Sequence, residues 1–137
     1  LHLEPINIYL EISEKNLGEK NVHPYIEPIL KEYFITEFNS NFIADKQNSD
    51  INIKVNVSTR TNMDKPNEFG IYQTFADATI DIKINNQEES VLSISINDIQ
   101  GADFTSFSEA GHKALKKIRN KIFDETLPEL VSILNKN

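Results

Sequence analysis

Four segments of the chain alternate apolar and polar residues with the period of two that is typical of β-strands. They are residues 6–13, 51–58, 76–84 and 92–97, and each places its aliphatic residues on one side only. Sheets with one covered and one solvent-facing side have this pattern and are mostly antiparallel. The sequence therefore predicts a four-stranded, mostly antiparallel sheet, with residues 85–89 as the hairpin loop between the third and fourth strands.

Two further segments carry apolar residues at helical spacing, and both are amphipathic. The first runs from about His23 to Phe42, and the second runs from about Phe107 to Leu134. Pro128 falls inside the second segment and removes one backbone hydrogen bond. We therefore expect a kink or break in the second helix near Thr126.

The order of elements is strand, helix, strand, strand, strand, helix. Two amphipathic helices with one apolar sheet face to cover predict an α+β two-layer sandwich, with both helices on one face of the sheet. Ser106 and Glu109 fit a capping box at the start of the second helix. The longest irregular stretch, from Thr59 to Gly70, is a polar connection, and residues 1–137 are expected to form a single domain.

Composition narrows the function classes. The 137 residues carry a formal net charge of −7 and include no cysteine. Disulfides, thiol nucleophiles and thiolate zinc sites are therefore excluded. The acidic balance disfavours nucleic acid as a partner, and no apolar run approaches the roughly 20 residues that cross a membrane as a helix.

The residues that most often carry chemistry form no convincing set. The four glycines lie too far apart for a dinucleotide-binding fingerprint or a P-loop. Glu109 and His112 have the spacing of a helical metal-ligand pair, and Ser108 and His112 could imitate a nucleophile and base, but further ligands or an oxyanion donor are missing. We predict no catalytic residue, no cofactor and no metal site, and we expect a protein that is not an enzyme.

Charged pairs also have a simpler explanation. Asp77 and Asp81 share the polar side of the third strand, but about 13 Å of strand separates them. Glycosidase carboxylates lie about 5–9.5 Å apart, so this pair is interpreted as solvating an exposed face. Lys113, Lys117 and Lys121 form a basic stripe, which either binds an acidic partner or is the solvent-facing side of the helix, and we favour the second interpretation.

Aromatic and large aliphatic residues gather where the long connection enters the third strand and just before the second helix. The candidate partner-binding residues are Phe69, Ile71, Tyr72, Phe75 and Phe104. By alternation, Ile71 and Phe75 fall on the polar side of their strand, which indicates a contact patch. Alternatively, the strand twists or bulges there and tucks these side chains under an edge.

The C-terminal half, residues 73–137, combines two alternating strands at 76–83 and 91–96 with a closing helix. The small residues at its turn and along this helix are Gly101, Ser106, Ala110 and Ala114. This stretch resembles the small α/β modules of bacterial envelope lipoproteins and their relatives. The group includes the flagellar assembly protein T, the curli secretion channel subunit, the activators of penicillin-binding proteins and the amino-terminal domain of the Tol periplasmic protein.

The resemblance implies a non-catalytic, protein-binding module of the bacterial cell envelope, either periplasmic or lipoprotein-derived. It implies a location in the periplasm or at the outer membrane, through a signal or lipidated cysteine upstream of Leu1, with the cytoplasm as the alternative. The partner would be an envelope protein or a second copy of the chain. Two other functions stay open: an acidic inhibitor or immunity protein that blocks a partner, and a small-ligand carrier or enzyme with a pocket between helices and sheet.

Overall fold

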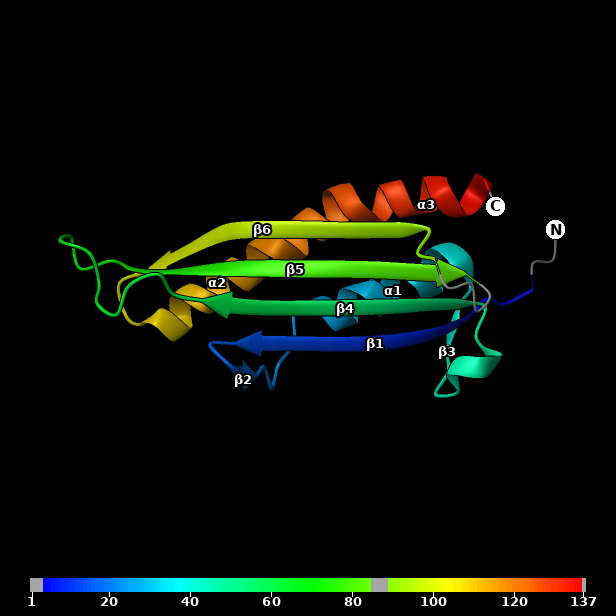
Figure 1. Ribbon diagram of the computed structural model, residues 1–137, viewed down its shortest axis with the longest axis horizontal. Helices are drawn as coiled ribbons and strands as arrows, with labels where there is room; N and C mark the ends of the chain where they lie inside the picture. Colours follow the sequence, from blue (N-terminus) through cyan, green and yellow to red (C-terminus); the bar gives the residue numbers. More distant parts are fainter. Residues whose placement is uncertain (1–3, 85–88, 137) are drawn as a thin grey trace.

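The computed structural model describes residues 4–84 and 89–136, which form one mixed β-sheet covered by helices (Figure 1). The strands are β1 (Asn7–Asn16), β2 (Glu19–Lys20), β3 (Asn41–Phe42), β4 (Ile51–Arg60), β5 (Tyr72–Ile84) and β6 (Leu92–Asp103). The helices are α1 (Ile26–Phe38), α2 (Phe107–Lys121) and α3 (Leu127–Lys136), with a short 3-10 helix at Lys46–Asn48. Most of the predicted hairpin loop at 85–89 lies outside the described residues.

The prediction of a four-stranded, mostly antiparallel sheet was wrong, although the α+β class is correct. The sheet has six strands in the order β2-β1-β4-β5-β6, and β3 pairs with the outer edge of β1. β1 is parallel to both β3 and β4, whereas β4, β5 and β6 are antiparallel. The reason is the helix α1, which returns the chain to the end where β1 began, as in any crossover connection. β2 and β3 have two residues each, which is too short to produce a periodic pattern.

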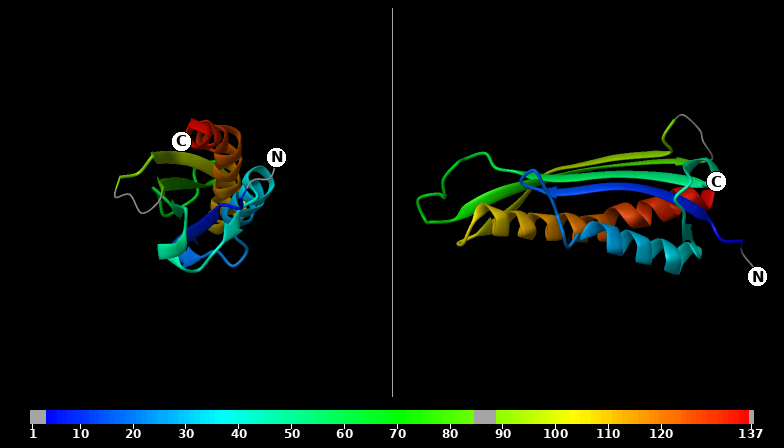
Figure 2. Two further views of the ribbon diagram at one scale, coloured as in Figure 1. Left: turned by 90° about the vertical axis from the view of Figure 1, so that its right-hand side faces the viewer. Right: turned by 90° about the horizontal axis from the view of Figure 1, so that it is seen from below.

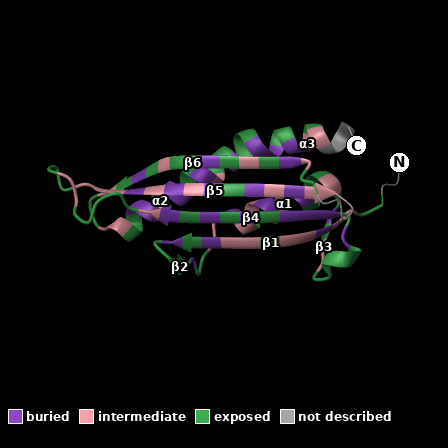
Figure 3. Ribbon diagram, viewed as in Figure 1, coloured by how far each residue is buried: buried purple, intermediate pink, exposed green. Residues whose placement is uncertain are grey.

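Helices α1, α2 and α3 lie on one face of the sheet, as the alternation predicted (Figure 2, right). From Ile53 onward in β4, buried residues alternate with exposed ones, and in β5 they alternate mostly with half-buried ones (Figure 3). Apart from Ile84 at the end of β5, the aliphatic side chains of the central strands β4 and β5 are at most 5% exposed and pack against the apolar sides of α1 and α2. The buried core contains Ile53, Val55, Ile80 and Ile82 from the sheet and Phe34, Leu115 and Ile118 from the helices.

Helix α1 ends four residues earlier than the predicted boundary at Phe42. Asn39 adopts the left-handed conformation, with φ of 50°, and its N–H donates to the carbonyl of Ile35 at 3.1 Å. Asparagine tolerates this conformation better than most residues and commonly ends helices in this way. The chain then turns so that Asn41 pairs with β1. Phe42 still packs against Phe34 of α1, with 6.5 Å between the ring centroids, so the apolar pattern continued beyond the helix.

The second predicted helix is present as two α-helices, α2 and α3, which follow each other directly through an irregular helical turn. Its start is confirmed, because the Ser106 hydroxyl accepts a hydrogen bond of 3.0 Å from the N–H of Glu109. A π-helical turn at Ile122–Thr126 separates α2 from α3, at the place where the kink was predicted. Pro128 has no N–H to donate to the preceding turn, so a regular helix cannot continue through it unchanged.

Two glycines let α2 approach the sheet closely. A Cβ atom on Gly101 of β6 would lie 2.0 Å from the carbonyl oxygen of Ala110 and 2.5 Å from the nitrogen of Ala114. A Cβ atom on Gly111 would lie 2.0 Å from Oδ1 of Asn16. Only hydrogen fits at either position, so these residues set the distance between α2 and the strands below it.

Candidate functional site

The predicted partner-binding residues lie at one end of the molecule, where β5 begins and β6 ends (Figure 1). Phe69 and Phe104 are 73% and 75% exposed, and Met63, from the β4–β5 connection, is 59% exposed. We call these three residues the apolar tip. Both termini of the described chain lie at the opposite end (Figure 1).

Asn67 shapes the loop that carries Phe69. Its side-chain oxygen accepts from the N–H of Phe69 at 2.9 Å and from the N–H of Ile71 at 3.0 Å, and its own N–H donates to the carbonyl of Ile71 at 2.9 Å. Gly70 has a φ of 76°, which only glycine adopts without cost. The loop thus holds Phe69 outward by hydrogen bonds rather than by packing.

The other predicted residues are half-buried and support the apolar tip rather than form it. The Tyr72 ring meets the Phe107 ring edge to face, with 4.9 Å between centroids. Ile71 and Phe75 line a pocket of about 200 Å³ together with Met63 and polar residues of the β4–β5 connection.

Phe75 remains on the solvent-facing side of the sheet, as alternation predicted, and it pairs in regular register with Arg60. The guanidinium of Arg60 lies 5.6 Å from the centroid of the Phe75 ring, a cation–π distance. The bulge that was weighed as an alternative does exist, but it lies in β6 opposite Asp77, where Asp98 has a φ of 61°. It leaves Phe75 in place.

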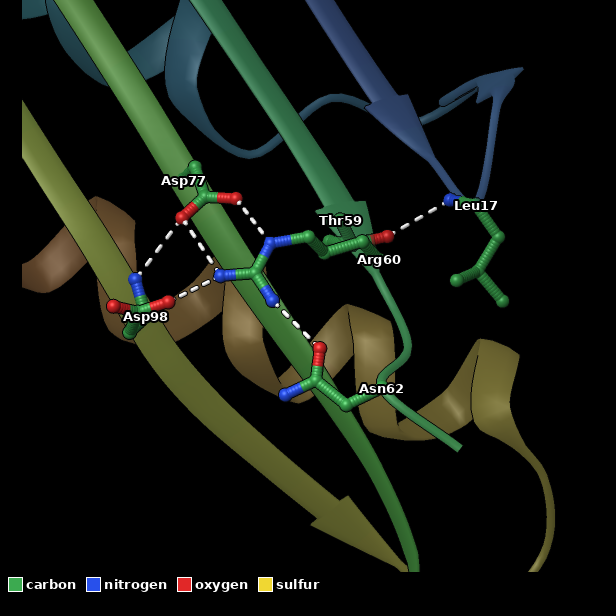
Figure 4. A network of polar contacts seen from close by, with 6 residues as sticks. All are labelled: Leu17, Thr59, Arg60, Asn62, Asp77 and Asp98. Atoms are coloured by element: carbon green, nitrogen blue, oxygen red, sulfur yellow. Dashed lines mark hydrogen bonds and ion pairs between the residues drawn. The ribbon is translucent and has the colours of Figure 1, made fainter. Parts of the chain in front are cut away.

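A polar network holds the side chain of Arg60, which lies beside Phe75. Figure 4 shows its contacts with Asn62, Asp77 and Asp98. The guanidinium donates to Asp77 at 2.9 Å and to Asn62 at 2.9 Å, and it also binds the carboxylate of Asp98. Hydrogen bonds to the two aspartates raise the pKa of Arg60 above its ordinary value. The Asp77 carboxylate also accepts a hydrogen bond of 3.0 Å from the N–H of Asp98, so it stabilises the bulge in β6 as well. Asp77 was predicted only to solvate an exposed face of the sheet, whereas in the structure it also binds Arg60 and the backbone of Asp98.

The basic stripe on α2 is occupied by contacts within the chain. Lys113 forms an ion pair with Asp103 at 2.7 Å, and its hydrogen bond lowers the pKa of that carboxyl far below the usual range. Lys117 donates to the carbonyl of Gln100 at 2.8 Å. Lys121 lies 3.8 Å from Glu125. All three lysines remain exposed, as predicted for the solvent-facing side of the helix, and Lys113 and Lys117 also bind residues of the edge strand β6.

The structure does not join the candidate catalytic residues. The hydroxyl of Ser108 lies 3.5 Å from Nδ2 of Asn16, whereas Nδ1 of His112 lies 3.3 Å from the Tyr25 hydroxyl. No hydrogen bond links Ser108 to His112 within the described residues. Over the same parts of the chain, residues 4–84 and 89–136, no group of histidine and carboxylate side chains is arranged to hold a metal ion.

Sequence reasoning missed a buried polar cluster at the end of β1. Glu14 is 6% exposed, and its carboxylate accepts hydrogen bonds from the side chain of Asn21 at 2.7 Å, from the Tyr25 N–H at 2.9 Å and from the Ile26 N–H at 3.0 Å. It thereby caps the start of α1, which has no cap of its own. The only signal was that Glu14 continues the apolar side of the strand.

Comparisons with known proteins identify no family. No protein-family model matches the chain, and no curated protein matches it. The chain is similar to a structure from Helicobacter pylori described as a neuraminyllactose-binding hemagglutinin homolog, with 13% identity over 98% of this chain and 93% of that chain, at a TM-score of 0.39. A likeness at this TM-score carries no conclusion about function. Among the described helices, none combines the length and the apolar character needed to cross a membrane.

Proposed function

We propose that the protein is a non-catalytic binding module of the cell envelope that holds a protein partner through the apolar tip. One observation carries this proposal: three large apolar side chains, 59–75% exposed, lie at one end of the sheet, and one of them, Met63, lines a pocket of about 200 Å³. Phe69 and Phe104 project into solvent from loops and contribute little to the core. A binding partner gives their placement a purpose that folding does not.

The geometry favours binding on energetic grounds. Burying one phenylalanine side chain contributes about 1.5–3 kcal/mol, and aromatic residues are common among the few that dominate an interface. The hydrogen bonds of Asn67 already order the loop that carries Phe69, so binding loses less conformational entropy there. Because the termini lie at the opposite end, a connection at either terminus leaves the tip accessible (Figure 1).

The envelope location is part of the proposal and has its own test. Fractionation of the source cells, together with the intact mass of the native protein, distinguishes an envelope module from an inhibitor or immunity protein. A processed or lipidated protein in the envelope fraction supports an envelope module. A cytosolic protein with an unprocessed start contradicts the envelope assignment and brings the inhibitor or immunity function forward.

The partner is tested by site-specific photo-crosslinking in the source cells. A photo-reactive amino acid replaces Phe69 in one variant and Phe104 in a second, and Val22 serves as the control because it is 81% exposed on the β2–α1 connection. We expect the same protein adduct at Phe69 and Phe104, and its absence at Val22. Equal labelling at all three positions, or no adduct at the tip, would contradict the proposal.

A further inference from the structure

The outer edge of β1 is covered at its two ends and open between them. β3 pairs with β1 only at Asn7 and Ile8, and β2 pairs with it only at Lys15 and Asn16. On the opposite edge, β4 pairs with β1 along residues 8–15. Within the described residues no strand occupies the outer edge of residues 9–14, which we call the edge gap (Figure 1).

The backbone groups that face the edge gap belong to the even-numbered residues of β1. The carbonyl of Ile8 accepts a hydrogen bond of 2.9 Å from the N–H of Ile43, the residue after β3. The carbonyl of Glu14 accepts a hydrogen bond of 3.0 Å from the N–H of Asn21, the residue after β2. The register of β1 shows no bulge between these positions. Because N–H and C=O groups alternate in direction along a strand, the same edge is faced by every even residue between them.

Leu10 and Ile12 are the even residues inside the edge gap. Their backbone N–H and C=O groups have no hydrogen-bond partner in the described parts of the chain. A row of unpaired groups on a strand edge is a template for pairing with another strand. The flanking strands leave residues 9–14 between them, about 20 Å of extended chain. The carbonyl of Glu14 at the end of this stretch is already bonded to Asn21, so an added strand would pair with Leu10 and Ile12.

The side chains of Leu10 and Ile12 show the same lack of a neighbour. In register beside them on β4, Ile53 and Val55 are 2% and 1% exposed. Leu10 and Ile12 carry equally apolar side chains on the same face, but they are only half-buried. A further strand in the edge gap would cover them from the open side.

We propose that the edge gap binds an extended peptide segment of a partner, about six residues long, as an added strand of the sheet. The peptide would alternate apolar side chains, placed toward Leu10 and Ile12, with polar side chains on the solvent-facing side of the sheet. Backbone hydrogen bonds to the same two residues would supply the pairing. This surface is independent of the apolar tip and does not rest on the proposed function.

Two comparisons favour a short peptide over other occupants. A second copy of the chain could not pair its own β1 here, because its β2 and β3 would meet those already flanking the gap. The other edge of the sheet, on β6, is interrupted in its second half, where a bulge lies opposite Asp77 and Lys117 donates to the carbonyl of Gln100 at 2.8 Å. Lysines and bulges on edges are devices that prevent strand addition, and β1 has neither between its flanking strands.

The test uses a tethered peptide, so that weak affinity does not hide binding. The chain has no cysteine, and a Lys20→Cys variant therefore offers a single attachment point beside the edge gap. A hexapeptide of alternating threonine and valine is attached through a flexible glycine–serine linker. The control carries the same hexapeptide with every amide N-methylated. It cannot donate the hydrogen bonds of an added strand, and its methyl groups keep the two backbones too far apart for its carbonyls to accept from Leu10 and Ile12. Hydrogen exchange of the Leu10 and Ile12 amides is then followed by NMR.

Both amides should exchange rapidly in the untethered protein, because they have no acceptor. The unmethylated peptide should slow their exchange by about 10-fold or more, as expected for an effective concentration near 1 mM and a dissociation constant near 0.1 mM. The methylated peptide should leave exchange unchanged. Equal exchange with both peptides, or protection that is confined to other parts of the chain, would overturn the proposal.

Discussion

Replacement of Glu14 by glutamine tests how the buried end of β1 is connected to α1. One carboxylate oxygen of Glu14 accepts from Asn21 and from the Tyr25 N–H, and the other accepts from the Ile26 N–H. Glutamine keeps the shape but has one oxygen. If that oxygen serves the first two donors, the new NH₂ group faces the N–H of Ile26, and neither group has an acceptor.

The magnitude follows from these contacts. A hydrogen bond to a charged group contributes about 1.5–3 kcal/mol, and a negative charge at a helix start contributes about 0.3–1 kcal/mol. Glu14 is 6% exposed, so water cannot substitute for the lost acceptor. We therefore expect Glu14→Gln to lower the free energy of unfolding by about 2–4 kcal/mol, from the sum of these contributions.

Urea denaturation followed by circular dichroism measures this loss. Glu11→Gln is the matched control, because Glu11 lies on the same strand but on the solvent-facing side, and its contact with Lys54 is a 3.6 Å exposed ion pair. Such pairs contribute about 0–1 kcal/mol, so the control should stay near the parent protein. If the two variants lose equal stability, Glu14 does not cap α1 as described.

Three further predictions rest on other contacts. Gly101→Ala should lower the free energy of unfolding by about 1–3 kcal/mol, because the new Cβ meets the backbone of α2, and an unchanged denaturation midpoint would contradict this close approach. Burial, and secondarily the Glu37 carboxylate, raises the pKa of Tyr33, so absorbance at 295 nm should show a tyrosine that titrates above pH 10 and disappears in Tyr33→Phe. The stability from this raised pKa is present below pH 10 and is lost as the pH rises through the higher value. The hydrogen bond from Lys113 lowers the pKa of Asp103, so the stabilising effect of this contact should be present at neutral pH and decline as acid protonates the carboxyl. Lys113→Met should move the titration of the Asp103 carboxyl, followed by NMR, to higher pH. A titration that does not move would contradict the assignment.

The alternation of apolar and polar residues was enough to predict which face of each long strand is covered, because burial follows side-chain direction directly. It could not predict strand direction, because parallel and antiparallel strands with one covered face show the same alternation of apolar and polar residues. The helix between β1 and β4 was the available signal for a parallel pair. The short strands β2 and β3 exist through backbone hydrogen bonds to β1, which leave no periodic trace.

The candidate site was predictable in part for the same reasons. Phe69 and Phe104 were named because aromatic residues gather before β5 and before α2, whereas alternation assigned only Ile71 and Phe75 to the polar side of their strand. Met63 was missed because it stands alone in a polar connection. The role of Arg60 depends on Asp77 and Asp98, which are brought together by strand pairing and a bulge, and no local pattern encodes that contact.

The central claim is that the apolar tip binds a protein partner, and the affinity of the purified partner tests it most directly. A Phe69→Ser and Phe104→Ser double variant is compared with Val22→Ser, which removes an exposed apolar side chain elsewhere. If each phenylalanine contributes about 2 kcal/mol, as an interface hot spot does, the double variant should bind more than about 100-fold more weakly, with an unchanged unfolding midpoint. Binding within twofold of the parent protein would show that the tip is not the interface.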